Sequence, residues 1–568
     1  MECSCYICYM YIQCSTVNRK GKNGRNRKLV ESFRDPVTGN PRNRTVQKLE
    51  KLPILERSRL ILRHGGQKHL DAEEWKSLVD AGDFKDLERS AYVGDSFRGA
   101  GNWVLLQYFR KTGLEQLLKK HLGNKTGAVI RDMVTLQILD PDSKLSYVKK
   151  RQNTLNYILD GKEVYHEDVF YRALDGLEVG FEPLRDSLNA SCPPLGRLLL
   201  YDLSNSYFCG SKAELGGYGD SKEKRHDRFI VSYGLVTGDD DLPLDIKVWK
   251  GGTADAKTVA KTFAGWKEKY RTPKAIWVAD RSMSDEGTLT KVRDMGLSYI
   301  TGLPAASQLA LLDRIHENCP ELFDQHLTEF TEDNRRYVLC RHHQKGYRRE
   351  MMNHRNLRRV YEALKKIQAS PQNSDREKLY HRAMKELEKY NQTKCWELSF
   401  QKVRDKKGKD RYRLLFRLDR HRFMAQNIIG HYYLLQTDLP NRELTAQEVR
   451  HYYQNLIKTE RCFRTFKSDL DIRPIRHRKA ERIRSHIYVN FLALWLVKRI
   501  EKNWRSRGIK SEVPPKLREW DRRMMLHEIL DGQNHQLKEL QWNQGPIAKE
   551  TFEEVKTFGE MEQHLPHL

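Results

Sequence analysis

The sequence of 568 residues contains no hydrophobic run long enough to cross a membrane. A spanning helix needs roughly twenty consecutive apolar residues, and the longest candidate, residues 487–497, is interrupted by Asn490. The first residues also lack a basic leader followed by a small-residue cleavage site, which a secretory signal would show. We therefore expect a soluble protein that has no membrane as a partner.

Closely paired cysteines are scarce as well. Of the ten cysteines, Cys3, Cys5, Cys8 and Cys14 lie near the start, no second close pair follows them, and the other six stand singly. A structural zinc site needs four ligands, as in two such pairs or in cysteines combined with histidines, so zinc binding is the weaker interpretation of this cluster. Reduced thiols of a cytoplasmic protein are the better one. The absence of an internal repeat excludes a solenoid.

Acidic residues are too few to balance the basic ones. The chain carries 102 Lys and Arg against 76 Asp and Glu, a formal net charge of +26, and the positive charge is spread along the chain. This predicts a polyanionic partner such as nucleic acid, although a basic protein without catalytic activity, such as a ribosome-associated factor, has the same property. The length predicts roughly three to five structural units.

Local patterns divide the first 193 residues into two parts. Residues 1–95 form a basic module in which LVESFRD and RTVQKLEKL flank a Pro-Val-Thr-Gly-Asn turn, predicting a β-hairpin. Residues 96–193 carry apolar residues at helical spacing, as in WVLLQYF and LEQLLKKHL. We expect a helical DNA-binding domain there. Its basic residues, such as Lys119 and Lys150, either contact phosphates or belong to solvated helix faces.

Strands and helices alternate from residue 194 to residue 304. Three strand-like segments joined by short turns precede helix–strand pairs, which predicts an α/β core: a mixed sheet with flanking helices, in the order of a ribonuclease H-like fold. The alternation stops in residues 305–444, which we expect to form an α+β insertion with a long helical run near 349–390. Two strong helices in 445–500 would close the core. Residues 501–568 form a polar C-terminal tail to which we assign no chemistry.

Two aspartates follow strand-like segments of the predicted core. Asp202 lies where LLLYDLS changes from apolar to polar, and Asp280 ends the run AIWVAD. Ligands of open α/β sheets bind at the carboxyl ends of strands, so both carboxylates are candidate catalytic and metal-binding groups. The alternative for either one is a helix cap or a loop residue. The aspartates of GDDDLPL, residues 238–244, are expected to be turn residues.

Glu460 lies on the first closing helix and is the candidate third acid. At about 100° per residue, Tyr453, Arg464 and Lys467 fall within about 40° of its direction. Apolar residues on the opposite side suit packing on a sheet, which would leave this polar stripe beside the strand ends. The alternative is an exposed helix face with ordinary ion pairs, Glu460 with Arg464 and Lys467 with Asp471.

Five segments carry a resemblance to a known family: YDLSNSYF, GYGDSKEKRHDRFIVSYGLV, LPLDIKVWKGGTADAKT, VADRSMSDEGTL and YYQNLIKTERCFRTFKSDLDIRP. Together they resemble the DDE transposases of bacterial insertion sequences, in the group named after insertion sequence four and its close relatives. The resemblance covers about residues 190–500. It implies a ribonuclease H-like catalytic core in which Asp202, Asp280 and Glu460 are the catalytic acids and hold two Mg²⁺ or Mn²⁺ ions.

The family's Tyr-Arg-Glu-Lys signature is matched in part. Tyr453, Glu460 and Lys467 occupy three of its places, whereas Leu456 stands at the usual arginine. The resemblance implies that Tyr453, Arg464 and Lys467 bind DNA, with Arg464 or a neighbouring arginine replacing the missing one.

The resemblance also implies a reaction and its partners. Element ends would be nicked by hydrolysis, and the freed 3′-hydroxyl would then attack target DNA. Trp396 of the insertion would hold a flipped base, unless it is a core residue. The partners would be double-stranded DNA and a second copy in a homodimer on DNA, at the nucleoid of a prokaryotic cytoplasm. A nuclease of the same fold and a non-catalytic relic or domesticated copy that only binds DNA are the alternatives.

Overall fold

A computed structural model describes residues 9–19, 22–34, 41–65, 69–81, 91–191, 197–264, 266, 275–370, 375–404, 410–531, 537–543 and 546–559. The chain forms two compact units. Unit 1 combines Met1–Gln107, Leu145–Val164 and Pro515–Leu568, and unit 2 combines Tyr108–Lys144 and Tyr165–Pro514. Within the described ranges, no helix has both the length and the apolar character that a membrane span requires.

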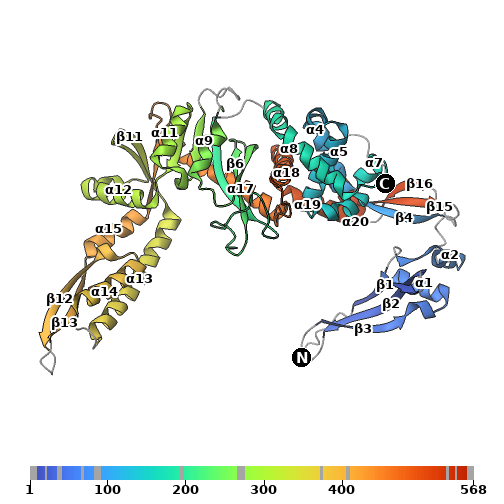
Figure 1. The fold of residues 1–568 in the computed structure, drawn as a ribbon, viewed down its shortest axis with the longest axis horizontal. Helices are drawn as coiled ribbons and strands as arrows, with labels where there is room; N and C mark the ends of the chain where they lie inside the picture. Colours follow the sequence, from blue (N-terminus) through green and yellow to red (C-terminus); the bar gives the residue numbers. More distant parts are fainter. Residues whose placement is uncertain are drawn as a thin grey trace. The chain divides into compact units, whose positions relative to one another are not determined.

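Unit 1 contains a three-stranded antiparallel sheet near the N-terminus (Figure 1). Its elements are β1 (Tyr9–Arg19), β2 (Lys22–Arg34), β3 (Pro41–Lys48), α1 (Ile54–Gly65) and α2 (Ala72–Asp80). β2 and β3 pair antiparallel, so the two segments expected to form a hairpin are neighbouring strands. Of the N-terminal cysteine cluster, Cys3, Cys5 and Cys8 lie outside the described residues, and Cys14 is exposed with its Sγ 3.4 Å from His69 Nδ1.

A second sheet of unit 1 joins segments far apart in the sequence. β4 (Ala91–Arg98) pairs with β15 (Met525–Asp531), which pairs with β16 (Leu537–Trp542). Its companion helices are α3 (Ala100–Lys111), α6 (Lys144–Gln152), α7 (Leu155–Leu159), α19 (Val513–Arg523) and α20 (Pro546–Gly559). The C-terminal region is therefore folded where it is described and is not the polar tail that we expected, because Trp520 and Leu526 enter a buried core.

Unit 2 is built on an eight-stranded mixed sheet in the order β10-β11-β14-β9-β8-β5-β6-β7. The strands are β5 (Leu198–Tyr207), β6 (Ile230–Thr237), β7 (Pro243–Lys250), β8 (Ile276–Ala279), β9 (Ser298–Gly302), β10 (Leu327–Glu332), β11 (Arg335–Arg341) and β14 (Tyr432–Thr437). β8 pairs parallel with β5 and with β9, and the other neighbours pair antiparallel. The expected mixed sheet in an α/β fold is confirmed.

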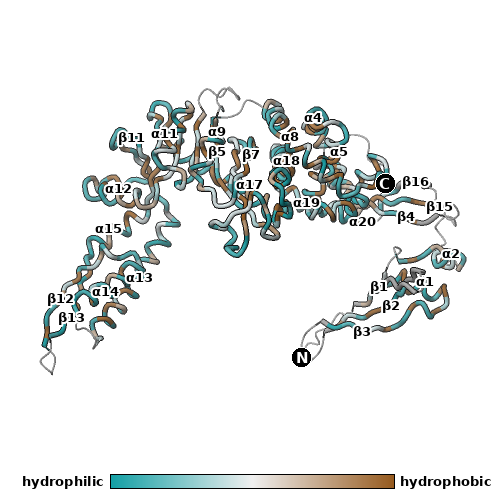
Figure 2. Tube along the Cα trace, viewed as in Figure 1, coloured by the Kyte–Doolittle hydropathy of each residue, from teal (hydrophilic) through white to brown (hydrophobic). Residues whose placement is uncertain are grey.

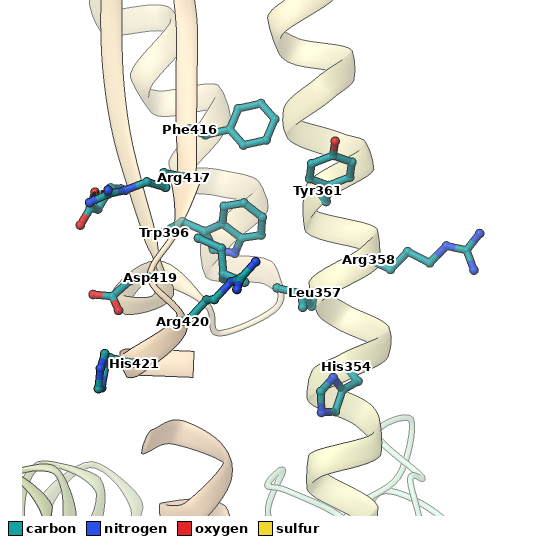
Figure 3. Close-up of a pocket in the computed structure, with 12 residues that line it drawn as sticks. His354, Leu357, Arg358, Tyr361, Trp396, Phe416, Arg417, Asp419, Arg420 and His421 are labelled. Carbon is teal, nitrogen blue, oxygen red and sulfur yellow. Dashed lines mark hydrogen bonds and ion pairs between the residues drawn. The ribbon is translucent and has the colours of Figure 1, made fainter. Parts of the chain in front are cut away.

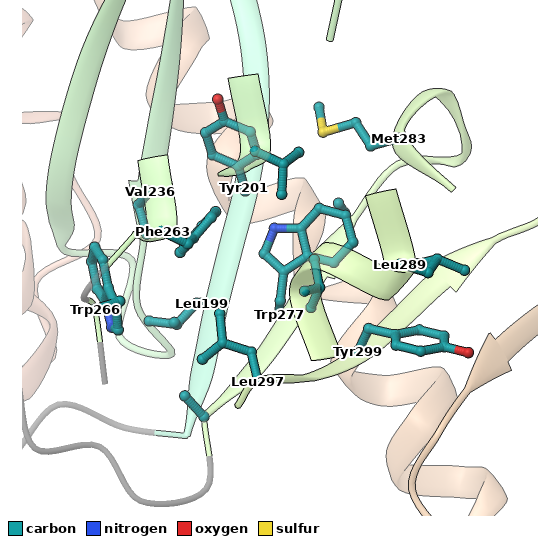
Figure 4. Close-up of a cluster of buried hydrophobic side chains, with 14 of the residues drawn as sticks. Leu199, Tyr201, Val236, Phe263, Trp266, Trp277, Met283, Leu289, Leu297 and Tyr299 are labelled. Carbon is teal, nitrogen blue, oxygen red and sulfur yellow. The ribbon is translucent and has the colours of Figure 1, made fainter. Parts of the chain in front are cut away.

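Hydrophobic cores lie on both faces of this sheet. On one face, Tyr201 and Trp277 pack with Phe263 of α9 (Ala256–Phe263) and Leu289 of α11 (Glu286–Asp294), as Figure 4 shows. On the other face, Leu200 packs with residues of α16 (Ala446–Gln454) and α17 (Leu456–Arg464). Because successive side chains of a strand point to opposite faces, every second residue of β5 faces these two helices.

Four long helices of unit 2 pack together. They are α4 (Leu114–Leu122), α5 (Asn124–Leu139), α8 (Glu167–Ala190) and α18 (Ala480–Ser506). α5 is buried from Val129 to Leu139, and Phe181 of α8 stacks on Tyr488 of α18 with 3.7 Å between ring centroids. The ion pair between Arg185 Nη1 and Asp245 Oδ1, 2.7 Å apart and buried, joins α8 to β7. This helical layer is thus fixed to the edge of the sheet.

Residues 305–444 do not form one separate insertion. β10, β11 and β14 belong to the core sheet because β11 pairs with β14 and β14 pairs with β9. The other elements are α12 (Ala305–Asn318), α13 (His343–Ala369), α14 (Arg376–Lys389), β12 (Trp396–Arg404), β13 (Asp410–Leu418) and α15 (Arg420–Gly430). Residues 343–430, here called the inserted lobe, have a core of their own. The single helical run expected near 349–390 is two helices, α13 and α14.

Candidate active site

Asp202 and Asp280 are neighbours at the end of the parallel strand pair β5–β8. The last paired residues are Tyr201 and Ala279; Asp202 is the next residue of β5, and Asp280 directly follows the end of β8. Leu200 faces α16 and α17, so the alternation along β5 places Asp202 on the same face of the sheet. α17 packs against β5. The strand register therefore brings together the two aspartates that the sequence singled out.

Burial and neighbouring carboxylates act on the Asp202 side chain. Burial is the largest effect and, together with the negative charges of Asp280 and Asp255, raises the pKa of Asp202 to about 6. Lys222 opposes this shift, as does the backbone N–H of Leu203, which donates to Asp202 Oδ1 at 2.8 Å. Asp280 and Asp255 are thus each close enough to repel an ionised Asp202. A cation bound between them would remove this repulsion.

We expect Asp202→Asn to raise the thermal stability of the metal-free protein. The folded state disfavours ionised Asp202, so wild-type stability is lost as the pH rises through the unfolded and then the folded pKa of this group, which is about 6. Asparagine cannot ionise, so the variant should melt several degrees higher near pH 8, and the gain should shrink toward about pH 4. Thermal denaturation in chelator across this range measures it. Equal melting temperatures near pH 8 would contradict the unfavourable ionisation.

Asp280 and Asp255 each precede a helical segment. Asp280 caps the short 3-10 helix Arg281–Met283, and its carboxylate accepts a hydrogen bond from the next backbone N–H at 2.7 Å. Asp255 precedes α9 and accepts a hydrogen bond from Ser282 Oγ at 3.2 Å. The sequence pattern does not single out Asp255, because an aspartate before a helix is ordinarily a cap. The structure adds it to the acidic surroundings of the first aspartate.

The closing helix is broken between Tyr453 and Glu460. α16 and α17 are separated at Asn455, and α17 continues into a π-helical turn at Thr465–Asp469, so the stripe calculated for one straight helix does not hold. Tyr453 nevertheless lies near both acids. Burial, the charge of Asp280 and the charge of Glu460 raise the pKa of its hydroxyl to about 12. Tyr453 therefore lies within electrostatic reach of β8 and of α17.

Glu460 is exposed, and within the described residues it forms no ion pair. The expected partner Arg464 instead has its Nη2 3.9 Å from Glu512 Oε1, and both of these side chains are exposed. Leu456, at the place of the family's arginine, packs against the core under α17. Leu456 therefore helps to hold α17 on the sheet, while Glu460 and Arg464 point to solvent.

Lys467 lies in the π-helical turn and is largely buried. Its Nζ is 3.3 Å from Glu223 Oε1, with the two side chains 14% and 13% exposed, and Arg473 pairs with the same glutamate. Burial lowers the pKa of Lys467, against the raising effect of Glu223. Within the described residues, the acid that pairs with Lys467 is Glu223, where the alternative interpretation expected Asp471. A contact of Lys467 with DNA would require phosphate to replace Glu223 as its partner.

Residues next to Glu460 anchor α17 on the sheet. Thr459 Oγ1 and Thr237 Oγ1 of β6 are buried and 2.7 Å apart. Lys458 Nζ lies 3.5 Å from Asp241 Oδ1 in the turn between β6 and β7. Of the neighbouring aspartates, Asp239 accepts a hydrogen bond from Leu198 N, and Asp240 pairs with Lys502 of α18. The prediction that these aspartates are turn residues is therefore confirmed.

The chemistry of the aspartates suits a divalent cation. Carboxylate oxygens are the ligands that Mg²⁺ and Mn²⁺ prefer, and the repulsion between Asp202 and Asp280 favours a cation beside them. Among the residues that the structure describes, no group of three or more His, Cys, Asp or Glu side chains is arranged to hold a metal ion. Glu460 is therefore not gathered with the two aspartates into one ligand set. Asp202 and Asp280 are the two carboxylates that the register of β5 and β8 brings close together.

Trp396, for which the resemblance implied a flipped base, is a core residue of the inserted lobe. It is 8% exposed, and its Nε1 donates to Gln392 Oε1 at 3.0 Å. It borders a cavity of about 880 Å³ between α13 and the strands β12 and β13, beside Tyr361 and Phe416 (Figure 3). The interpretation of Trp396 as a core residue is confirmed.

Comparisons with known proteins give a distant likeness among solved structures. No family model matches the chain, and no curated protein matches it in sequence. Among solved structures it is similar to the cryo-EM structure of a piggyBac transposase synaptic complex with hairpin DNA, with a TM-score of 0.36 and 9% identity over 74% of this chain and 79% of that chain. A similarity of this extent assigns neither a family nor a function.

Proposed function

We propose that this protein is a DDE-type DNA transposase with a ribonuclease H-like core, and that Asp202, Asp280 and Glu460 are its catalytic acids. The register of β5 and β8 carries the proposal, because it sets the two predicted aspartates side by side at the end of a parallel strand pair. The packing of α17 on β5 supports a third acid from that helix. The net charge of +26 suits a polyanionic substrate.

The residues of the proposed site divide into metal ligands and groups that contact phosphate. Asp202 and Asp280 would hold Mg²⁺ or Mn²⁺, and Glu460, exposed on α17, would complete the ligand set. Two such ions supply charge stabilisation for the attacking and leaving oxygens of an in-line phosphoryl transfer. With its pKa of about 12, the hydroxyl of Tyr453 keeps its proton near neutral pH and can donate it in a hydrogen bond to a phosphate oxygen. Exposed Arg464 suits a phosphate contact.

The proposed reaction cleaves element ends and joins them to target DNA. Hydrolysis would free a 3′-hydroxyl at each end, and that hydroxyl would attack the second duplex. Because two ends have to be processed together, we propose a homodimer on DNA, at the nucleoid of a prokaryotic cell. A nuclease of the same fold would use the same acids and stop after cleavage, and a relic copy would bind DNA without either step.

The DNA that flanks the reading frame supplies the test substrate. With Mg²⁺ or Mn²⁺, the purified protein should nick fragments that carry the element ends and join them to a second duplex. Ca²⁺ should support binding with little cleavage, because its larger and looser coordination shell fits the in-line geometry poorly. Gel separation of nicked and joined products measures both steps. Nicking without joining would favour the nuclease, and cleavage that survives chelation would contradict the metal-dependent mechanism.

A further inference from the structure

The solvent side of α13 in the inserted lobe is strongly basic. Eight of its cationic residues are exposed: Lys345, Arg348, Arg349, Arg355, Arg358, Arg359, Lys365 and Lys366. The helix has 27 residues and is roughly 40 Å long; most of its length has hydrophilic colours in Figure 2. Its other side, with Val360, Leu364 and Ile367, packs into the core of the lobe. The cations therefore lie on a helix that is held in place from behind.

Four of these cations form one stripe, here called the α13 stripe. At about 100° and 1.5 Å per residue, Arg348, Arg355, Arg359 and Lys366 fall within about 40° of one another and extend over roughly 27 Å. The stripe is about 130° away from the buried side of the helix. Arg358 points elsewhere and lines the cavity of Figure 3. One straight edge of the lobe thus presents a row of positive charge.

The exposed cations of α13 differ in their partners from some other cations of the lobe. In the part of the chain that the structure describes, none of the eight forms an ion pair with a carboxylate. Elsewhere in the lobe, Lys394, Lys402 and Arg417 each lie within 2.8 Å of an aspartate or a glutamate. Arg355 and Arg359 place like charges at i, i+4, where a solvated helix face gains from opposite ones, and the one exposed acid beside the stripe, Glu362, forms no ion pair within the described residues. Such an arrangement favours an external polyanion as the missing partner.

We propose that the α13 stripe binds the sugar–phosphate backbone of double-stranded DNA, as a sequence-independent contact outside the catalytic site. The inference rests on the proposed function and names a surface for its substrate. Lys and Arg neutralise phosphates and release condensed counterions, which supplies most of the affinity for DNA of any sequence. A stripe of about 27 Å spans roughly eight base pairs at 3.4 Å each. Its length therefore suits several phosphates of one backbone.

The test replaces the four stripe cations by glutamine: Arg348→Gln, Arg355→Gln, Arg359→Gln and Lys366→Gln. A matched control removes four acid-paired cations of the same lobe: Lys394→Gln, Lys402→Gln, Arg417→Gln and Arg422→Gln. Both sets lose the same net charge. Each is made together with Asp202→Asn, so that cleavage does not interfere, and circular dichroism checks folding. Fluorescence anisotropy then follows the binding of a labelled duplex of arbitrary sequence over a salt series.

Near 0.1 M salt, the affinity of the stripe variant for the duplex should be lower than that of wild type by about tenfold or more. The slope of log affinity against log salt concentration should become shallower by roughly three to four released counterions. The control should change binding by less than about threefold. Equal losses in both variants, or unchanged binding by a folded stripe variant, would overturn the proposal. Unchanged binding with altered dimerisation would also overturn it, because exposed Tyr347 and Met352 on α13 would then mark a protein interface. Cleavage of element ends by the wild type is measured separately. Failure of that cleavage would count against the proposed function, whereas unchanged duplex binding by the stripe variant would count against the α13 proposal alone.

Discussion

Asp202→Asn, Asp280→Asn and Glu460→Gln should each reduce DNA cleavage by about three orders of magnitude or more. Each change keeps the size of the side chain and removes a negatively charged oxygen ligand. Metal-assisted stabilisation of the transition state is worth several kcal/mol, and about 1.4 kcal/mol corresponds to tenfold in rate. Binding to element ends should stay within a few-fold of wild type, because affinity depends on basic residues that contact phosphates. Nicking and gel-shift assays on the same samples measure both quantities.

Glu448→Gln is the matched control for the glutamate. Glu448 closes a capping box with Thr445 at the start of α16, and glutamine can keep that box. Cleavage by this variant should therefore equal that of wild type. Persistent cleavage by Glu460→Gln would place the third acid elsewhere: lost cleavage in the control would then point to Glu448, and otherwise Glu443 is the next residue to substitute. Persistent cleavage by either aspartate variant would refute the proposed metal site.

Arg185→Ala should destabilise unit 2 by about 3–5 kcal/mol. Arg185 and Asp245 are 2% and 4% exposed, and their ion pair joins α8 to β7. Burial already raises the pKa of Asp245, and the Arg185 charge opposes that rise. Without the guanidinium, a buried carboxylate is left without its partner. Urea denaturation followed by tryptophan fluorescence measures the loss.

A second ion pair between the same two elements supplies the control. Lys247 Nζ lies 2.7 Å from Glu182 Oε1, but these side chains are 26% and 64% exposed. Solvent screens such a pair, so Lys247→Ala should cost less than about 1 kcal/mol. Equal losses in Arg185→Ala and Lys247→Ala would mean that burial does not set the contribution of these pairs.

Local sequence patterns predicted the strands of the core and the two aspartates beside them. The runs around Asp202 and Asp280 change from apolar to polar where the parallel pairing of β5 and β8 ends, so composition and register agree. The helix break at Asn455 was not predictable, because apolar spacing continues through it. The break depends on tertiary contacts such as Thr459 with Thr237 of β6. Periodicity within one segment carries no information on such contacts.

Long-range pairing explains the other differences. The charged helical region that precedes residues 432–437 predicts that they belong to an insertion, yet β14 adds to the core sheet through β9. Likewise, Lys467 was expected near phosphate or Asp471, and its partner Glu223 comes from a loop before β6. Helical spacing identifies neighbours only along one helix. Which side chain from a distant segment becomes a residue's partner depends on how the strands and helices are arranged in the fold.

The pairing of β4 with β15 has a consequence for the order in which the protein is made. β4 (Ala91–Arg98) leaves the ribosome long before β15 (Met525–Asp531) does. Until then β4 is an unpaired strand edge, of the kind that promotes association between chains. A chain that stops before Met525 would contain all three proposed acids and still lack the partner of β4. A soluble fragment of the catalytic core therefore has to begin after Arg98.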